Sequence, residues 1–230
     1  MAIILCIESS ADYCSVCISD GGNVISSKIS QETYAHSRYL AVIIQECIDR
    51  SSYTLQQMDA IALSGGPGSY TSLRVGASIA KGICYTINKP LIVVPSLHII
   101  AQPFVASLQS SQLVIPAIDA RRDEAYITVL NGQEEAEIPL KAYIFDNLSF
   151  SDYTKKGIEL IICGNAADKA GRLISDHERK TFIQSEPMAT DMVAIAQRSY
   201  ASETFADVAY FQPEYLKSPN ITTPKKSIIP

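Results

Sequence analysis

Runs of apolar residues predict the order of strands and helices in the first half of the chain. Short apolar or β-branched runs, which favour strands, lie at residues 2–7, 13–19, 24–31, 59–64 and 91–94. Apolar residues spaced three and four apart, which favour helices, lie at about residues 35–50, 72–88 and 96–109. Three meandering strands followed by alternating helices and strands indicate a mixed sheet with helices packed against it.

The second half of the chain begins with the same order of residues as the first. When the halves are set against each other with an offset of 111, residues 7–21 lie over residues 118–132, so that Glu8 falls on Asp119. A second matching pair, residues 60–66 and residues 160–165, follows in the same order, which predicts an internal duplication. Strands are predicted at residues 113–118 and 124–130, and helices at about residues 166–176 and 190–202. Residues 133–157 give no readable pattern.

Two lobes that each open with a strand, an acidic residue and a hairpin resemble the architecture of actin, Hsp70 and sugar kinases. We therefore predict an α/β protein with a two-lobed actin-like ATPase (ribonuclease H-like) fold, in which duplicated mixed-sheet lobes carry flanking helices. The lobes are expected at residues 1–99 (ribonuclease H-like) and 100–212 (a degenerate copy), followed by a tail at residues 213–230. In such architectures the hairpins and a glycine turn bind ATP, because backbone N–H groups contact phosphate while an acid positions the magnesium ion.

Composition limits the classes of function. The 230 residues are 47% apolar, which is enough for a full core, and 19 Lys and Arg against 24 Asp and Glu give a net charge of −5. This charge argues against binding of nucleic acid by the chain alone. The first residues, MAIILCIESS, are expected to form a strand rather than a signal peptide, and no apolar run approaches the length of a membrane span. We therefore expect a cytoplasmic protein with no membrane association.

The six cysteines lie mostly inside apolar segments and are expected to be buried, reduced thiols. Cys14 and Cys17 have the C-x-x-C spacing of metal and redox sites. Residues three apart in a strand point to opposite faces, however, so we expect no such site. No two of the three histidines (His36, His98 and His177) have the spacing of metal ligands, so no metal site is predicted. His36, at the start of the first helix, is expected to cap it or to lie on the surface.

Residues 64–76, SGGPGSYTSLRVG, combine a glycine-rich turn with the start of a helix. The stretch lacks the lysine of a Walker A loop, which excludes P-loop chemistry. Its glycines allow tight turning, and a helix N-terminus behind such a turn can hold an anion. The alternative is a strand-to-helix corner capped by Ser69, Thr71 or Ser72, and physical reasoning alone favours this alternative.

The expected cleft retains only part of a nucleotide site. The second hairpin, Asp119–Asp123, has no glycine and carries two arginines where phosphates would lie. Those arginines either bind phosphate or fill an empty cleft by pairing with Glu8, Asp12 or Asp123. We therefore predict a vestigial nucleotide or anion site rather than productive ATP hydrolysis. Its candidate residues are Glu8, Ser9, Ser10, Gly66, Gly68, Asp119, Arg121, Arg122 and Gly164.

Several stretches resemble one family in the order in which that family has them. GGPGSYTSLRVG is similar to GPGSFTGLRIG, the motif of the TsaB (YeaZ) family of bacterial tRNA-modification proteins. ILCIESS, DARRDEAY and PEYLKSP also resemble segments of that family, and the likeness covers essentially all 230 residues, although it is weak over residues 133–157. Ser72 stands where the family usually has glycine, and Glu8 stands where it more often has aspartate.

The resemblance implies a function without catalysis. TsaB is a paralogue of TsaD, which transfers a threonylcarbamoyl group to adenosine 37 of tRNAs that read codons beginning with A. It implies a heterodimer with TsaD formed mainly through the two helices of the first lobe, a ternary complex with TsaE, a homodimer when alone, and contact with tRNA only through the complex. No cofactor is expected to be required by this chain, while the complex interface is left open as a place for ATP or ADP. TsaD carries a His-x-x-x-His pair for a metal, which nothing here matches.

The first predicted helix is apolar over an unusually wide arc, as expected for a helix packed on two sides. We expect Leu40→Glu or Ile44→Glu to weaken partner binding more than folding. Two other function classes are considered: an actin-like ATPase or kinase active on its own, and a stand-alone RNA-binding module, which the acidic charge disfavours. The expected partner interface consists of His36, Leu40, Ile43, Ile44, Cys47, Tyr70, Leu73, Ile79 and Ile83.

Overall fold

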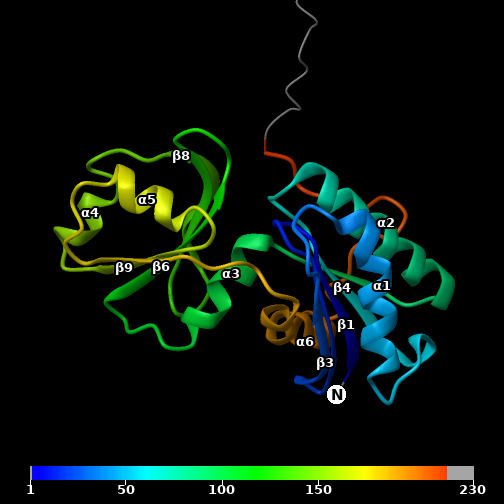
Figure 1. The fold of residues 1–230 in the computed structure, drawn as a ribbon. Helices are drawn as coiled ribbons and strands as arrows, with labels where there is room; N and C mark the ends of the chain where they lie inside the picture. The colour runs from blue at the N-terminus through cyan, green and yellow to red at the C-terminus, as the bar shows by residue number, and fades with distance from the viewer. Residues whose placement is uncertain (1, 217–230) are drawn as a thin grey trace, which may run out of the picture.

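The computed structural model describes residues 2–216 and consists of two lobes, each built on a five-stranded sheet (Figure 1). The first sheet has the order β3-β2-β1-β4-β5. Strands β1 and β4 are parallel, while β2 is antiparallel to both of its neighbours, β1 and β3. The strands of this sheet are β1 (Ile3–Glu8), β2 (Ser15–Asp20), β3 (Asn23–Ile29), β4 (Ala60–Ser64) and β5 (Leu91–Val94).

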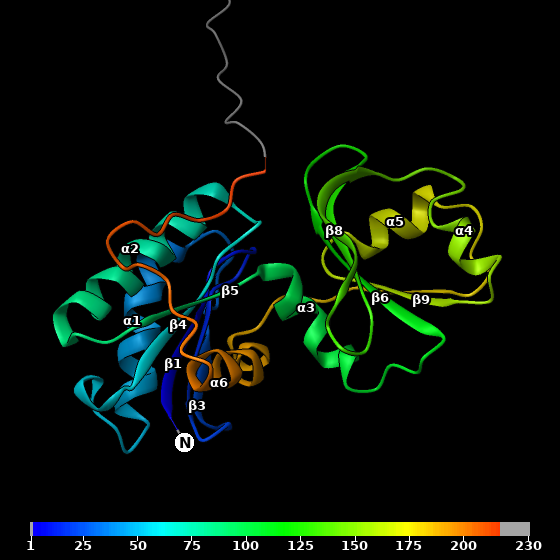
Figure 2. The same ribbon diagram turned by 180° about the vertical axis from the view of Figure 1, so that it is seen from behind.

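Helices cover both faces of the first sheet, as Figures 1 and 2 show. Helices α1 (His36–Asp49) and α2 (Tyr70–Ile87) lie on one face, and a short 3-10 helix, η1 (Leu55–Gln57), precedes β4. The other face carries η2 (Ala189–Met192) and α6 (Val193–Ala201). Because side chains alternate along a strand, Leu5 and Ile7 of β1 join the core under α1 and α2, while Ile4 and Cys6 join the core under α6.

The second lobe repeats this plan. Its sheet has the order β10-β9-β6-β7-β8, with α3 (Ser96–Val105) against one face and α4 (Ser151–Thr154) and α5 (Ala167–Leu173) against the other. Its strands are β6 (Gln112–Asp119), β7 (Glu124–Leu130), β8 (Ala136–Ile144), β9 (Glu159–Cys163) and β10 (Lys180–Ile183). Within residues 2–216, no helix combines the length and apolar character needed to cross a bilayer.

The fold class predicted from the sequence is confirmed, and the two sheets match strand for strand. Reading β3-β2-β1-β4-β5 against β8-β7-β6-β9-β10 places β1 on β6 and β4 on β9. Glu8 and Asp119, which the offset of 111 brought together, are the last residues of β1 and β6. The pattern missed β8 and β10. Strand β8 is an edge strand that is largely solvent-exposed, so its sequence lacks an apolar run, and β10 has four residues.

The helix near the end of the chain packs on the first lobe and not on the second lobe, to which we had assigned it. Residues 189–201 were assigned to the second lobe, but Met192, Val193 and Ala196 are buried against β1 and β4 of the first sheet. Arg198 of α6 also makes an ion pair of 2.7 Å with Glu134, which lies between β7 and β8 of the second lobe. Helix α6 is amphipathic in sequence, but its periodicity could not say which of two sheets it covers. Residues 217–230 of the expected tail lie outside the described residues.

All six cysteines are buried free thiols. Cys14 lies in the core under α1, and Cys17 lies in the core on the opposite face of the sheet. The prediction that this C-x-x-C pair points to opposite faces is therefore confirmed. Burial raises the pKa of Cys84 to about 11, and it raises the pKa of Cys14 as well. Thiols of this kind are poor nucleophiles at neutral pH.

Met192 tests whether α6 is part of the first lobe's folding unit. We expect Met192→Ala to lower the free energy of unfolding by about 2–5 kcal/mol, because it leaves a cavity between η2 and the first sheet. The control, Arg198→Ala on helix α6, which follows η2 directly, removes a half-exposed ion pair and should cost less than about 1 kcal/mol. Urea denaturation measures both, and equal effects would contradict the packing described above.

Candidate functional site

The glycine-rich stretch forms a tight corner between β4 and α2. Gly66 has a φ of +104°, a backbone conformation that residues other than glycine rarely adopt. The N–H of Ser69 donates to the carbonyl of Ser10 at 2.8 Å, so the first hairpin lies directly on the corner. A Cβ atom at Gly68 would overlap that same carbonyl, and one at Gly76 would overlap the hydroxyl of Ser9. These two glycines allow the chain to approach itself closely.

Residues from the end of the chain cover the other side of this corner. The C-terminal strap, residues 204–216, runs along α2 (Figure 1), and Lys81 donates to the carbonyls of Ala209 and Phe211 at 3.0 and 3.1 Å. The N–H of Glu214 donates to the carbonyl of Gly65 at 2.8 Å. A Cβ at Gly66 would lie 2.8 Å from the carbonyl oxygen of Glu214. The chain's own backbone therefore occupies both sides of the turn that was considered for an anion.

The start of α2 is joined to the start of α1 by hydroxyl groups. Ser69 is the N-cap residue of α2 but makes no side-chain cap hydrogen bond, so the capping role we expected for it is not seen. The hydroxyl of Ser72 instead donates to the Oγ of Ser69 at 2.9 Å. The same Ser72 Oγ lies 3.3 Å from Nδ1 of His36. His36 is buried, which corrects the expectation of a surface position, and burial lowers the pKa of its imidazole.

Glu8 ends β1 as a completely buried carboxylate. Burial raises its pKa to about 7, although two hydrogen bonds from Ser10, one from the N–H at 2.8 Å and one from the hydroxyl, favour ionisation. Its second oxygen, Oε2, has no hydrogen-bond partner within residues 2–216. Ser9 lies beside it, and its N–H donates to the hydroxyl of Ser64 at 3.0 Å.

Two further acidic residues belong to the electrostatic surroundings of Glu8: Glu186 acts on Glu8, and Asp12 acts on Glu186. Burial and the negative charge of Asp12 raise the pKa of Glu186 to about 7, and the charge of Glu186 in turn raises the pKa of Glu8. Asp12 also holds the hydroxyl of Tyr34, which raises the pKa of that tyrosine. We call Glu8, Asp12 and Glu186 the acidic rim. Neither Glu186 nor Tyr34 was singled out in the sequence, because neither belongs to a motif and they are far apart along the chain.

The second hairpin is held by its own lobe. Asp119 accepts from Lys169 Nζ at 2.6 Å and from the N–H of Arg121 at 2.6 Å. Arg121 and Arg122 are exposed, and both have positive φ values, 72° and 51°. Within residues 2–216 neither guanidinium forms an ion pair, so the pairing with Glu8, Asp12 or Asp123 that we considered is not observed.

The residues predicted for a vestigial nucleotide site thus lie in two separate groups. Gly164 has a φ of +108° and packs against the carbonyl of Ala117, as the duplication with the first lobe suggests.

A hollow of about 220 Å³ lies beside β2 and β3, between Ser27 and Met188, and another of about 240 Å³ lies in the second lobe near Phe150. Neither hollow is lined by Glu8, Asp119 or Gly164. Among residues 2–216 no three His, Cys, Asp or Glu side chains are grouped so that they could hold a metal ion.

Most of the predicted partner-interface residues are buried in the chain's own core. His36, Leu40, Ile43, Ile44, Cys47 and Leu73 are at most 5% exposed, and Ile79 and Ile83 are partly buried against the same core. Tyr70 is 43% exposed. The burial of these residues argues against the expectation that Leu40→Glu or Ile44→Glu would weaken partner binding more than folding, because each would place a carboxylate in the core.

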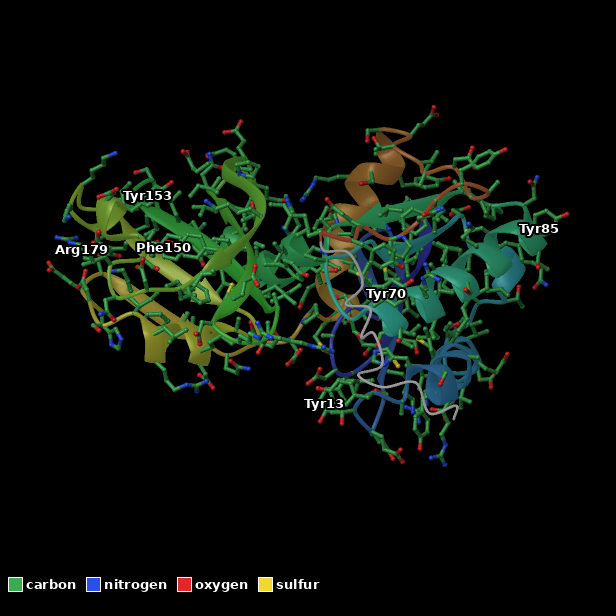
Figure 3. The ribbon with its side chains drawn as sticks, turned by 90° about the horizontal axis from the view of Figure 1, so that it is seen from above. Tyr13, Tyr70, Tyr85, Phe150, Tyr153 and Arg179 are labelled. Carbon is green, nitrogen blue, oxygen red and sulfur yellow. The ribbon has the colours of Figure 1, made fainter. Side chains whose placement is uncertain are left out.

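The outer surfaces of α1 and α2 carry a different set of residues. Val42 of α1 is 49% exposed and Tyr85 of α2 is 87% exposed. Figure 3 shows Tyr70 and Tyr85 near opposite ends of α2. A Cβ atom at Gly82 would meet nothing within 4 Å. We call Val42, Gly82 and Tyr85 the helix face. The sequence signal for the helix face was the wide apolar arc of the first helix, because that arc includes Val42.

The comparisons with known proteins agree on one family. The TsaD family model, described as tRNA N6-adenosine threonylcarbamoyltransferase, matches residues 23–225. A Haemophilus influenzae protein named tRNA threonylcarbamoyladenosine biosynthesis protein TsaB is 34% identical over 126 residues, which is 54% of this chain and 52% of that protein. The Escherichia coli protein of the same name is 28% identical over 226 residues, covering 94% of each. The solved structure of YeaZ from Pseudomonas aeruginosa has the same fold, with a TM-score of 0.79 and 22% identity over 94% of this chain and all of that one.

Gly76 and Gly82 provide a matched pair of substitutions within α2. We expect Gly76→Ala to lower the free energy of unfolding by about 1–3 kcal/mol, because the new methyl group overlaps Ser9 and lies 3.2 Å from Leu63. Gly82→Ala should raise it by about 0.5–1 kcal/mol, because it faces open space and alanine favours a helix. Thermal and urea denaturation distinguish the two. A tolerated Gly76→Ala would mean that the hairpin does not pack on α2 as described.

The buried carboxylate of Glu8 should make stability depend on pH. Its pKa is about 7 in the folded chain and 4.5 for an ordinary glutamate, so its favourable contribution is full below pH 4.5 and is lost as the pH rises through 7. Glu8→Gln removes this ionisation. The stability advantage of the variant over the wild type should therefore grow by roughly 2 kcal/mol between pH 5 and pH 8.

Denaturant titrations of both proteins at the two pH values measure this difference. Glu186 is present in both proteins, so the comparison isolates Glu8. An advantage that is the same at pH 5 and pH 8 would show that Glu8 is not buried as an acid.

Proposed function

This chain belongs to the TsaD family of tRNA N6-adenosine threonylcarbamoyltransferases, within it to the TsaB (YeaZ) proteins, and from this we propose that it is a non-catalytic subunit of the machinery that makes threonylcarbamoyladenosine in tRNA. In this proposal it forms a heterodimer with a catalytic TsaD protein and activates it. TsaE joins as a third component, the chain forms a homodimer when it is alone, and tRNA is contacted only within the complex.

The helix face carries the proposal of a protein partner. An exposed valine on α1, an exposed tyrosine on α2 and a glycine that leaves open space beside it suit the approach of another helix, since small residues allow helices to pack closely. Tyrosine is enriched among residues that dominate binding energy. This surface covers the outside of the helices whose inner sides form the core of the first lobe.

The closed glycine corner supports a role without catalysis by this chain. The hairpin residue Ser10 and the strap residue Glu214 lie against the turn from opposite sides, where a nucleotide phosphate would need space. The exposed arginines of the second hairpin lie in the other lobe, and Asp119 is paired with Lys169. We propose that this chain needs no cofactor of its own and that any ATP or ADP in the system binds where the partner contributes to the site.

Two matched substitutions test the helix face. Val42→Asp places a charge on the helix face, and Leu148→Asp places one on an aliphatic side chain of the second lobe that is 69% exposed. We expect Val42→Asp to weaken binding to the TsaD protein of the same organism about tenfold or more, because burying an unpaired charge at an interface costs upwards of about 1.4 kcal/mol. Leu148→Asp should bind like the wild type. Isothermal titration calorimetry gives both affinities, and circular dichroism checks that both variants are folded.

The same proteins separate this proposal from the alternative of an independent ATPase. The chain alone should show no turnover of ATP, and modification of tRNA by the reconstituted proteins should fall with the affinity of Val42→Asp. Weaker binding by Leu148→Asp alone would move the interface to the second lobe. Magnesium-dependent ATP hydrolysis by the chain alone, lost in Glu8→Gln, would favour the enzyme instead.

A further inference from the structure

Two buried thiols stand directly opposite each other in the first sheet. Cys6 of β1 and Cys17 of β2 are partners in the antiparallel register of these strands. Both are 0% exposed, and both belong to the core between the sheet and α6, so their side chains lie on the same face of the sheet. The C-x-x-C spacing pairs Cys17 with Cys14 in the sequence, whereas the strand pairing places Cys17 beside Cys6.

The strand pairing sets these two cysteines at a separation that a disulfide can span. Directly opposed residues of antiparallel strands have Cα atoms about 4.5–5.5 Å apart, and disulfides join residues whose Cα atoms are about 4.4–6.8 Å apart. The Cβ atoms of opposed residues are about 4.5–5.5 Å apart and must approach to about 4 Å for the bond to form. Such a bond carries some strain, and strained disulfides are the ones that are readily reduced.

Cys17 also connects the sheet to the segment that covers it. Its thiol donates to the carbonyl of Ala189, the first residue of η2, at 3.2 Å. The N–H of Ala189 donates in turn to the hydroxyl of Ser15 at 2.9 Å. The neighbouring thiol of Cys6 and burial raise the pKa of Cys17, so that it stays a protonated donor at neutral pH. A disulfide with Cys6 would remove that proton and take this donor away from Ala189.

A hollow reaches the segment that covers the two thiols. The hollow of about 220 Å³ beside β2 and β3 is lined in part by Ser15 and Ala189. Ala189 therefore both lines the hollow and accepts the hydrogen bond from Cys17. A water molecule takes up about 30 Å³ of liquid, and hydrogen peroxide is little larger, so the hollow has room for an oxidant of this size. The hollow brings such a molecule next to the residue that contacts Cys17.

We propose that Cys6 and Cys17 form a reversible disulfide when the chain meets a peroxide, and that this bond releases η2 from the sheet. One thiol, as its thiolate, attacks the peroxide, so that an S–O bond forms, the O–O bond breaks and water leaves. The second thiol attacks the resulting sulfenic acid, an S–S bond replaces the S–O bond, and a second water leaves. Two thiols thus lose two hydrogens, and the peroxide is reduced to two waters.

Release of η2 would also act on the contact between the lobes. Segment η2 leads directly into α6, whose Arg198 makes the ion pair of 2.7 Å with Glu134 of the second lobe. A looser attachment of η2 therefore weakens the hold of α6 on both lobes. The chemistry of the two thiols is independent of the proposed function, and it gives the first sheet a response to oxidants.

Peptide mapping after peroxide treatment tests the disulfide. The reduced full chain is treated with hydrogen peroxide, the remaining thiols are alkylated in denaturant, and a protease that cleaves after Glu and Asp separates Cys6 from Cys17. We expect the two peptides to be joined, with fragment spectra that assign the bond to Cys17 and not to Cys14, and an intact mass lowered by two hydrogens. A thiol reductant should restore both thiols. Oxidised glutathione, which is too large for the hollow, should give no joined peptide in the same time.

Two cysteine variants provide a matched comparison. Cys17→Ala removes one partner and should abolish the joined peptide. Cys84→Ala is the control, because Cys84 is also buried and its thiol also donates to a backbone carbonyl, that of Pro90 at 3.7 Å, but it lies in α2 rather than opposite another cysteine. This control should form the bond between Cys6 and Cys17 as the wild type does.

Hydrogen exchange measures the release of η2. Amides of residues 189–201 should exchange about two- to tenfold faster in the oxidised wild type than in the reduced protein, as expected for the loss of one buried hydrogen bond. Helix α1 should not change and serves as the internal reference. The reduced Cys17→Ala variant lacks the same donor, so it should exchange as fast as the oxidised wild type and show no further change after peroxide.

Three results would overturn the proposal. The first is that peroxide leaves both thiols intact, or oxidises them separately to sulfinic acids, without a joined peptide. The second is that the joined peptide forms as readily in denaturant as in the folded chain, which would mean that the strand register plays no part. The third is that the disulfide forms while exchange of residues 189–201 is unchanged, which would refute the release of η2.

Discussion

The close approach of the first hairpin to the glycine corner is the constraint on which the first lobe depends. The carbonyl of Ser10 accepts from Ser69, and the glycines at positions 68 and 76 leave no room for a side chain there. This contact fixes where α2 begins, and α2 with α1 then covers one face of the sheet. The strap closes the corner from the other side through Glu214. Segments from the start, middle and end of the chain therefore meet at one turn.

The same contact limits the space for a phosphate at the glycine corner. A phosphate site needs backbone N–H groups that are free and space in front of them. Here the N–H of Ser69 is used by the hairpin, and the turn is covered by the strap. In the proposed function, the outer surface of the first lobe's helices is the part that binds a partner. A rigid inner side, formed by residues such as Leu40 and Leu73, holds that surface in place.

The two lobes share a topology but differ at the acidic residue that ends the leading strand of each sheet. In the first lobe the acid that ends the leading strand, Glu8, is completely buried and its pKa is raised to about 7. In the second lobe the equivalent acid, Asp119, is partly exposed and is paired with Lys169. One acid is buried and the other is paired with a lysine, so the two matching positions differ in their electrostatics.

The sequence by itself determined the local elements and the duplication. Burial on one side of a strand or helix makes apolar residues recur every two or 3.6 positions, so β1, α1 and α2 could be predicted. The similarity of the two halves of the sequence matched Glu8 with Asp119. The glycine motif also located the corner between β4 and α2, but it did not indicate that Ser10 and Glu214 pack against that corner. Exposed edge strands such as β8 carry no such period and were missed.

Only the tertiary structure decided what each apolar side packs against. Periodicity shows that Leu40 and Ile44 lie on a buried side, but not whether a sheet or a partner buries them, and here the chain's own sheet does. In the same way α6 could have covered either sheet, and it covers the first. The acidic rim joins Asp12 to Glu186 across most of the chain, a proximity that arises from the fold and leaves no local pattern. Contacts between residues distant in sequence depend on packing and electrostatics in three dimensions, which a one-dimensional period cannot record.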